Sequence, residues 1–151
     1  MSSDFPFSTA RSSLLNTETF RNLLGNALEN STKSVIVLSA YVKTVGVNWL
    51  KEKISDKKIN CTIVTRWNNG DLAQGSSDLE CYHLAKTNGW SFKVLQDLHA
   101  KVMLVDDEIL FIGSPNLTGR GMSLVPVSNE ELGIKVKALD EDLKIINQLV
   151  D

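Results

Sequence analysis

Two apolar runs of strand length constrain the fold of this 151-residue chain more than any other feature. Lys33–Val42 (KSVIVLSAYV) and Ile59–Arg66 (INCTIVTR) are rich in β-branched residues and are apolar almost throughout, rather than at every second position. A strand with one face in water alternates polar and apolar residues, whereas a strand covered on both faces does not need to. The two runs therefore predict central strands of a sheet that is covered on both faces.

Helical patterns alternate with these strands along the chain. Apolar residues recur at helical spacing in Asn16–Glu29, where Asn16 or Thr17 is a plausible N-cap. Further helices are expected at Val47–Ile54, from Ser77 or Asp78 to Thr87, and at Leu139–Val150. Further strands are expected at Trp90–Leu95, His99–Val105, Ile109–Ile112 and Glu131–Val136, with a hairpin at Asp106–Glu108 and loops at Asn68–Ser77 and Ser114–Ser128. This order predicts an α/β sandwich, a mixed and mostly buried sheet flanked by helices on both faces.

Size and composition predict one domain over residues 1–151, with 1–15 as a loosely ordered N-terminal segment. No apolar run reaches the length of a membrane span, and Met1–Ser13 lacks the basic and apolar regions of a secretory signal. Cys61 and Cys81 have no metal-site spacing and are expected to be reduced thiols. We therefore expect a cytoplasmic protein without membrane contact. The net charge of −2 argues mildly against a dedicated nucleic-acid binder, although a local basic cluster would suffice.

The segment Leu98–Asp106 carries the residues best suited to chemistry. On a strand, residues two apart point to the same face, so His99 and Lys101 are expected to project together. An imidazole beside an ammonium suits an anion, such as a phosphate, held between them. After the next predicted strand, Gly113, Ser114 and Asn116 place a hydroxyl and a carboxamide beside a glycine that permits close backbone approach.

These residues resemble the signature of the phospholipase D superfamily. The matching pattern is His99-x-Lys101-x4-Asp106, followed by Gly113–Ser114 and Asn116 and further on by Asn129-x-Glu131. Upstream, Thr65–Trp67 and Asp71–Asp78 resemble the bacterial nuclease branch, which includes catalytic domains of metal-independent restriction enzymes. The resemblance covers about residues 20 to 137 and is strongest from His99 onward. It implies a phospholipase D-like catalytic domain.

The resemblance also implies roles for these side chains. His99 would attack phosphorus and form a covalent phosphohistidine, while a second histidine protonates the leaving oxygen. Lys101 and Asn116 would stabilise the phosphate oxygens, with a weaker contact from Ser114. Glu131 would hold His99 Nδ1–H and fix its tautomer, and Asp106 would support the site. Because the chain has one motif, two subunits of a homodimer would complete one active site. No metal or other cofactor is implied.

Arg66, at the end of a predicted central strand, suits either a phosphate contact or a surface salt bridge. DNA is the expected substrate, and further domains or subunits would have to supply sequence specificity. Two alternatives stay open: a phospholipase or phosphatidyltransferase of the same superfamily, and a nucleic-acid-binding module without turnover. The superfamily's lipid enzymes usually carry two motifs in a longer chain, and a module without turnover would be expected to have lost His99 or Lys101.

Overall fold

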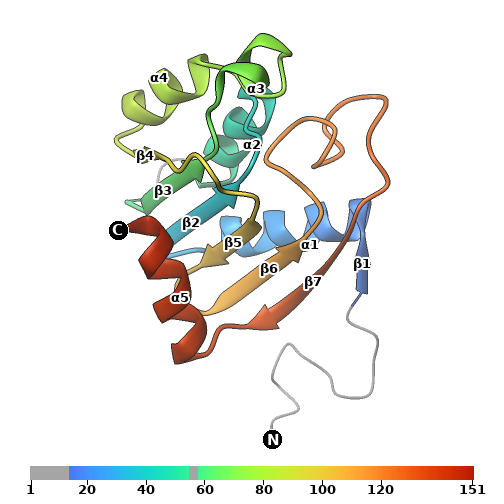
Figure 1. Cartoon of the computed structure of the whole chain (residues 1–151). Coiled ribbons are helices and arrows are strands. Elements are labelled where there is room, and N and C mark those ends of the chain that lie inside the picture. The colour runs from blue at the N-terminus through green and yellow to red at the C-terminus, as the bar shows by residue number, and fades with distance from the viewer. Residues whose placement is uncertain (1–13, 55–57) are drawn as a thin grey trace, which may run out of the picture.

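A seven-stranded mixed sheet forms the centre of the computed structural model, which describes residues 14–54 and 58–151 (Figure 1). The strands lie in the order β1-β7-β6-β5-β2-β3-β4. Three neighbours are parallel: β2 (Ser34–Ser39), β3 (Asn60–Thr65) and β4 (Ser91–Val94). The others pair antiparallel: β5 (Lys101–Val105), β6 (Ile109–Gly113), β7 (Leu132–Lys137) and β1 (Leu14–Asn16). The predicted mixed sheet is confirmed.

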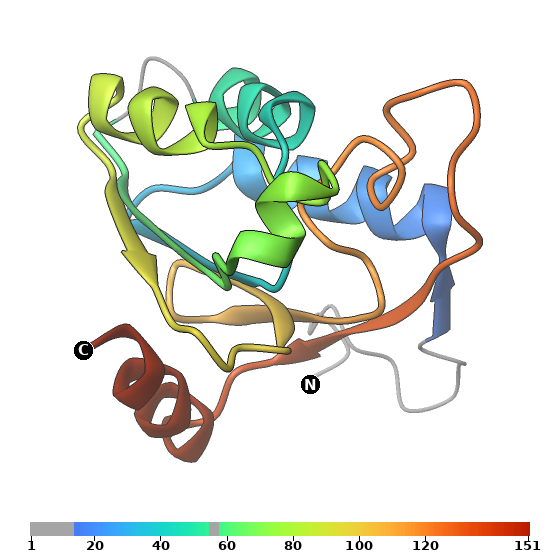
Figure 2. The same cartoon turned by 45° about the horizontal axis from the view of Figure 1, so that its top comes forward.

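Helices cover both faces of the sheet (Figure 2). One face carries α1 (Thr17–Glu29), α2 (Thr44–Ile54) and α4 (Glu80–Thr87), and the opposite face carries α5 (Asp140–Val150). Each face has its own hydrophobic cluster, and β2 contributes to both. Val35 and Val37 are buried on the side of α1 and α2, whereas Leu38 is buried on the side of α5. Burial on both faces explains why the β2 sequence does not alternate.

The N-terminal end of α1 forms as its sequence predicts. Asn16 Oδ1 accepts a hydrogen bond from the backbone N–H of Thr19 at 2.9 Å, so Asn16 is the N-cap. The strand before it was not predicted. Leu14 and Leu15 belong to β1, which pairs with β7, so the prediction of a loose segment is wrong at these two residues. Residues 1–13 of that predicted segment lie outside the described residues.

Two further local expectations need correction. The predicted loop Asn68–Ser77 contains a short helix, α3 (Asn69–Ala73), because the Asn68 side chain accepts from the backbone N–H of Asp71 at 2.8 Å. Helix α4 begins at Glu80 without a side-chain cap. The expected caps, Ser77 and Asp78, instead accept backbone N–H groups from Val42 and Thr44, and so tie α4 to the segment after β2.

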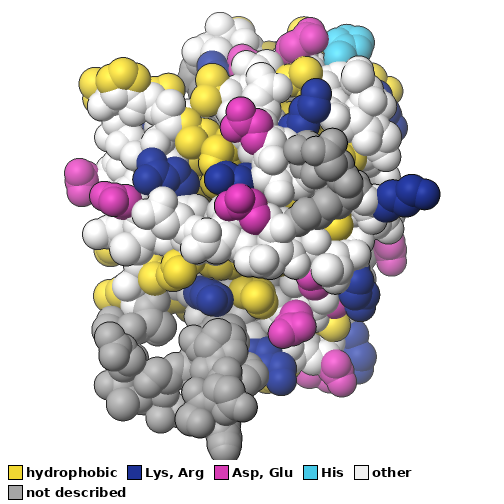
Figure 3. Space-filling view, turned by 180° about the vertical axis from the view of Figure 1, so that it is seen from behind, with side chains coloured by type: hydrophobic (Ala, Val, Ile, Leu, Met, Phe, Trp, Pro, Cys, Tyr) yellow, Lys and Arg dark blue, Asp and Glu magenta, His cyan; other side chains and the backbone are white. Residues whose placement is uncertain are grey.

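The surface on the side of α1 and α2 mixes basic and acidic side chains over its described part, with some hydrophobic side chains between them (Figure 3). Among residues 14–54 and 58–151, no helix has both the length and the apolar character needed to cross a membrane.

Candidate active site

The polar residues singled out in the sequence, except Asp106, lie at one edge of the sheet, which we call the site edge. Parallel strands end on the same side, and an antiparallel neighbour begins there. Ser39, the last residue of β2, accordingly pairs with Thr65 at the end of β3 and with Lys101 at the start of β5. Strand β6 ends and β7 begins at the same edge, where Gly113 pairs with Gly133. Residues distant in sequence are thereby brought together.

His99 lies at the site edge but not on a strand. Strand β5 begins at Lys101, so the predicted strand was two residues too long at its start. The physical reason is its partner: β2 ends at Ser39, opposite Lys101, and offers nothing for His99 to pair with. His99 is exposed, and the half-buried Lys101 donates from Nζ to the His99 carbonyl oxygen at 3.2 Å. The Lys101 ammonium is therefore held against the backbone of His99 at the site edge.

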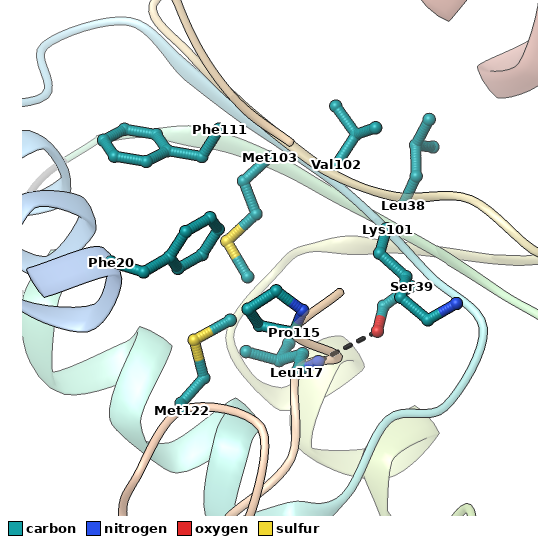
Figure 4. Close-up of a pocket in the computed structure, with 10 residues that line it drawn as sticks. All are labelled: Phe20, Leu38, Ser39, Lys101, Val102, Met103, Phe111, Pro115, Leu117 and Met122. Carbon is teal, nitrogen blue, oxygen red and sulfur yellow. Dashed lines mark hydrogen bonds between the residues drawn. The ribbon is translucent and has the colours of Figure 1, made fainter. Parts of the chain in front are cut away.

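Asn116 is fixed so that its amide nitrogen is available to a ligand. Its Oδ1 accepts the backbone N–H of Tyr41 at 3.1 Å and lies 3.3 Å from Ser39 Oγ. The buried Ser39 hydroxyl also donates to the Tyr41 carbonyl at 2.6 Å and accepts the N–H of Leu117 at 2.9 Å (Figure 4). Among residues 14–54 and 58–151, Asn116 Nδ2 has no hydrogen-bond partner, so its two N–H groups can donate to a ligand.

A small cavity lies beneath Lys101 and Ser39 (Figure 4). Its lining is mainly apolar and includes Phe20 of α1, Met103 of β5 and Phe111 of β6. The rings of Phe20 and Phe111 meet edge to face, with centroids 5.6 Å apart. These buried side chains provide a packed floor under the polar groups of the site edge.

Ser114 and Glu131 are in contact with each other. The Ser114 hydroxyl donates to Glu131 Oε1, and Asn129 Nδ2 donates to Glu131 Oε2 at 3.0 Å. Thr17, the first residue of α1, holds this segment because its hydroxyl donates to the Asn129 carbonyl and accepts the Glu131 N–H at 2.8 Å. Among the residues that the structure describes, no hydrogen bond joins Glu131 to His99, so that predicted role stays a prediction.

Two glycines permit close backbone contacts around these residues. A Cβ at Gly113 would lie 2.4 Å from the Leu132 carbonyl oxygen, so β6 and β7 can approach only with glycine there. A Cβ at Gly121 would lie 2.4 Å from the carbonyl oxygen of Asn116. Gly121 therefore lets the loop after β6 fold against the backbone of Asn116.

Asp106 lies at the far end of β5, about 17 Å from Lys101 at the usual rise of a strand. Its carboxylate accepts the backbone N–H groups of Thr32, Lys33 and Ser34 at 2.8–3.1 Å. Asp106 and Asp107 both have φ of 56°, as in the tight hairpin turn that the sequence predicts between β5 and β6. Asp106 thus supports the fold and is remote from the site edge.

Arg66 follows β3 and is held by two partners. Its Nε and Nη2 donate to the Asp71 carboxylate at 3.0 and 3.2 Å, and Nη2 also donates to Tyr41 OH at 2.8 Å. The guanidinium lies over the Tyr41 ring, 5.0 Å from its centroid. The hydrogen bond to Asp71 raises the pKa of Arg66. A salt bridge, one of the two interpretations of Arg66, is therefore present. Within the part of the chain that the structure describes, Nη1 has no hydrogen-bond partner, and the predicted substrate contact stays a prediction.

Sequence reasoning missed three residues that organise the site: Thr17, Ser39 and Tyr41. A signal for two of them was present, because Ser39 and Tyr41 are polar residues that follow the apolar stretch Val35–Leu38. Thr17 was considered only as an N-cap, and its contact with Asn129 joins positions 112 residues apart. Within residues 14–54 and 58–151, no three His, Cys, Asp or Glu side chains gather into a metal-ligand group.

The decisive comparison is with protein families. The model described as cardiolipin synthase, phospholipase D-like domain, matches residues 24–150, which is most of the chain. The chain belongs to the phospholipase D-like family. The predicted resemblance to the phospholipase D superfamily is thereby confirmed at the level of the family. A search of curated proteins found no match.

Solved structures share the phospholipase D-like fold with this chain. NucT from Helicobacter pylori is 18% identical, with a TM-score of 0.64 over 90% of this chain and 93% of that one. Nuc from Salmonella typhimurium, a phospholipase D family member, is 15% identical, with a TM-score of 0.69 over 91% of each chain. Phosphatidylserine synthase from Haemophilus influenzae is 12% identical, with a TM-score of 0.70 over 92% of this chain but 36% of that one.

Proposed function

We propose that this chain is a metal-independent phosphodiesterase that cleaves DNA through a covalent intermediate on His99. The observation that carries the proposal is the grouping at the site edge. Lys101 contacts the backbone of the exposed His99, and Ser39 pairs with Lys101 while it lies within 3.3 Å of Asn116. A cation and a free amide donor beside an imidazole are the groups needed to bind and stabilise a phosphate that is under attack.

The proposed reaction proceeds in two steps. His99 Nε2 attacks phosphorus, the P–N bond forms, and the bond from phosphorus to the leaving oxygen breaks. His99 of the partner subunit gives its proton to that oxygen. It then takes a proton from water, whose oxygen attacks phosphorus and breaks the P–N bond. Lys101 Nζ and Asn116 Nδ2 stabilise the negative charge that builds on the non-bridging oxygens in both steps.

The remaining predicted residues keep supporting roles in this proposal. Ser114 positions Glu131, because its hydroxyl donates to the Glu131 carboxylate. Glu131 would reach His99 Nδ1–H when a substrate or a second subunit orders the exposed imidazole. Arg66 would contact a phosphate neighbouring the scissile one through Nη1.

The number of histidines supports the proposal of a homodimer. The chain has two, and His83 lies in α4 with its ring against Tyr82. In this proposal, the second catalytic histidine is His99 of a second copy of the chain. Mixing wild-type protein with the His99→Ala variant, under conditions of subunit exchange, tests this. If two subunits share each active site, activity should fall with the square of the wild-type fraction. A linear fall would show that each chain acts alone.

Coverage of the solved structures supports DNA cleavage over lipid chemistry. Nuc and NucT are covered over more than nine tenths of their own chains, whereas phosphatidylserine synthase is covered over about a third. The description of the family model, cardiolipin synthase type, makes a phosphatidyltransferase the second candidate. Purified protein and His99→Ala should be incubated in excess EDTA with single- and double-stranded DNA, and separately with phosphatidylglycerol vesicles. DNA cleavage by the wild type alone supports the proposal, and lipid turnover alone would replace it with the second candidate.

A further inference from the structure

A groove adjoins the site edge and shares three residues with the site: Tyr41, Asn116 and Asn129. The groove, of about 430 Å³, is lined by these three residues and by Lys43, Val45, Arg120 and Val125, together with glycines and small hydroxyl residues. Its size falls within the range of pockets that hold small organic ligands. Anything bound in it would lie directly beside the phosphate bound by Asn116.

The loop that forms one wall is held in place by backbone hydrogen bonds. The Leu117 carbonyl accepts the Lys43 N–H at 3.0 Å, and the Arg120 carbonyl accepts the Asn129 N–H at 3.0 Å. Gly119 packs closely on Val125, since a Cβ there would lie 2.7 Å from Val125 Cγ1. The groove is therefore formed before a ligand arrives.

The charge of the groove suits an anion. Its described lining contains two cations, Lys43 and Arg120, and no Asp or Glu. Lys43 is paired with Asp78 at 3.4 Å. Arg120 is exposed, and among the described residues its guanidinium has no hydrogen-bond or ion-pair partner. Arg120 is thus the cation available to a phosphate, and the planar guanidinium binds phosphate in a two-pronged manner.

The groove also offers apolar surface next to this cation. Val45 is 43% exposed, and Val125 lines the same groove. A nucleotide presents this combination, with a phosphate at one end and the apolar faces of a sugar and a base at the other. A two-valine wall is short for an acyl chain of a lipid.

We propose that this groove binds the nucleotide that adjoins the scissile phosphate of a nucleic acid, with Arg120 on the flanking phosphate. The inference deepens the proposed function and rests on it for the position of the scissile phosphate. It assigns substrate binding to Arg120, Val45 and Val125, which the catalytic motif does not include.

The test measures binding without cleavage, in the His99→Ala background and in EDTA. The probe is a fluorescein-labelled single-stranded oligothymidylate, and its affinity is followed by anisotropy between about 50 and 200 mM KCl. Arg120→Gln should weaken binding about tenfold. It should also make the slope of log affinity against log salt less negative by about 0.7, which corresponds to the loss of one phosphate contact. Arg120→Lys should retain the slope. Lys144→Gln, at an exposed lysine of α5, removes the same charge elsewhere and should change neither quantity.

An Arg120→Gln variant with the affinity and salt slope of its parent would overturn the proposal, as would a parent that fails to bind the oligonucleotide. If Arg120→Gln lost binding to phosphatidylglycerol vesicles but kept its binding to the oligonucleotide, the groove would be assigned to a lipid headgroup. This result would also overturn the proposal. The outcome is independent of turnover. If the wild type cleaves no DNA but Arg120 sets the salt slope, the proposed reaction fails and the nucleic-acid groove stands.

Discussion

Replacement of Asp106 by alanine should destabilise the protein without removing a catalytic group. The carboxylate accepts N–H groups from three consecutive residues, Thr32 to Ser34, which connect α1 to β2. Hydrogen bonds to a charged group contribute about 1.5–3 kcal/mol each, and water replaces part of them where the donors are exposed, as at Thr32 and Lys33. We expect a loss of about 3 kcal/mol from these contacts.

The matched control is Asp107→Ala. Asp107 has the same φ of 56°, so both variants place alanine in the left-handed region at a cost of about 1 kcal/mol. Asp107 is exposed, and among the described residues its carboxylate has no hydrogen-bond partner. The difference between the two variants therefore isolates the carboxylate contacts of Asp106.

The assay is thermal unfolding together with urea titration. For a chain of this size, a loss of about 3 kcal/mol lowers Tm by about 6–12 °C. Asp106→Ala should melt that far below Asp107→Ala, and its activity per folded molecule should match the wild type well below Tm. Equal stability of the two variants would refute the structural role assigned to Asp106. If folded Asp106→Ala lost as much activity as His99→Ala, the conclusion that Asp106 is remote from the site would be refuted.

Three further predictions concern the site edge, the cysteines and the sheet. Asn116→Asp keeps an oxygen that accepts the Tyr41 N–H, but it replaces the amide donor by a negatively charged oxygen. Activity should therefore fall about 10²–10³-fold while Tm stays unchanged. Retained activity would exclude Asn116 from phosphate binding. Burial raises the pKa of Cys61 and of Cys81 to about 12, with Asp78 adding to the effect at Cys81. Because the thiolate is the reactive form, Ellman's reagent should label neither thiol in native protein at neutral pH and both in guanidinium chloride, and rapid native labelling would contradict their burial. Gly133→Ala should lower the free energy of unfolding, measured by urea titration, by about 1–3 kcal/mol, because its Cβ would lie 2.5 Å from the Phe20 ring. The control Gly70→Ala has room for a Cβ and should leave that free energy unchanged. Equal stability of the two variants would contradict the tight packing of β7 on α1.

The fold class and most elements could be predicted because their signals are local. The run that forms β2 is apolar on both sides, and the Asn16 cap and the spacing of Phe20, Leu24 and Leu28 specify α1. Strand β1 escaped prediction because three residues carry no periodicity, and its existence depends on pairing with β7.

The candidate site was predictable in its residue types but not in its contacts. The start of β5 depends on where β2 ends, so the position of His99 outside the strand is set by Ser39. The roles of Thr17 and Tyr41 depend on contacts with residues at least 75 positions away in sequence. Spacing rules describe neighbours on one element, and they do not reach such contacts.

The covalent role of His99 is tested most directly by the stereochemistry of cleavage at phosphorus. A DNA substrate with one chiral phosphorothioate link would be cleaved in isotopically labelled water, and the configuration of the product determined. Each in-line displacement inverts phosphorus, so attack by His99 followed by attack of water predicts overall retention. Inversion would show a single direct attack by water and would contradict the phosphohistidine intermediate.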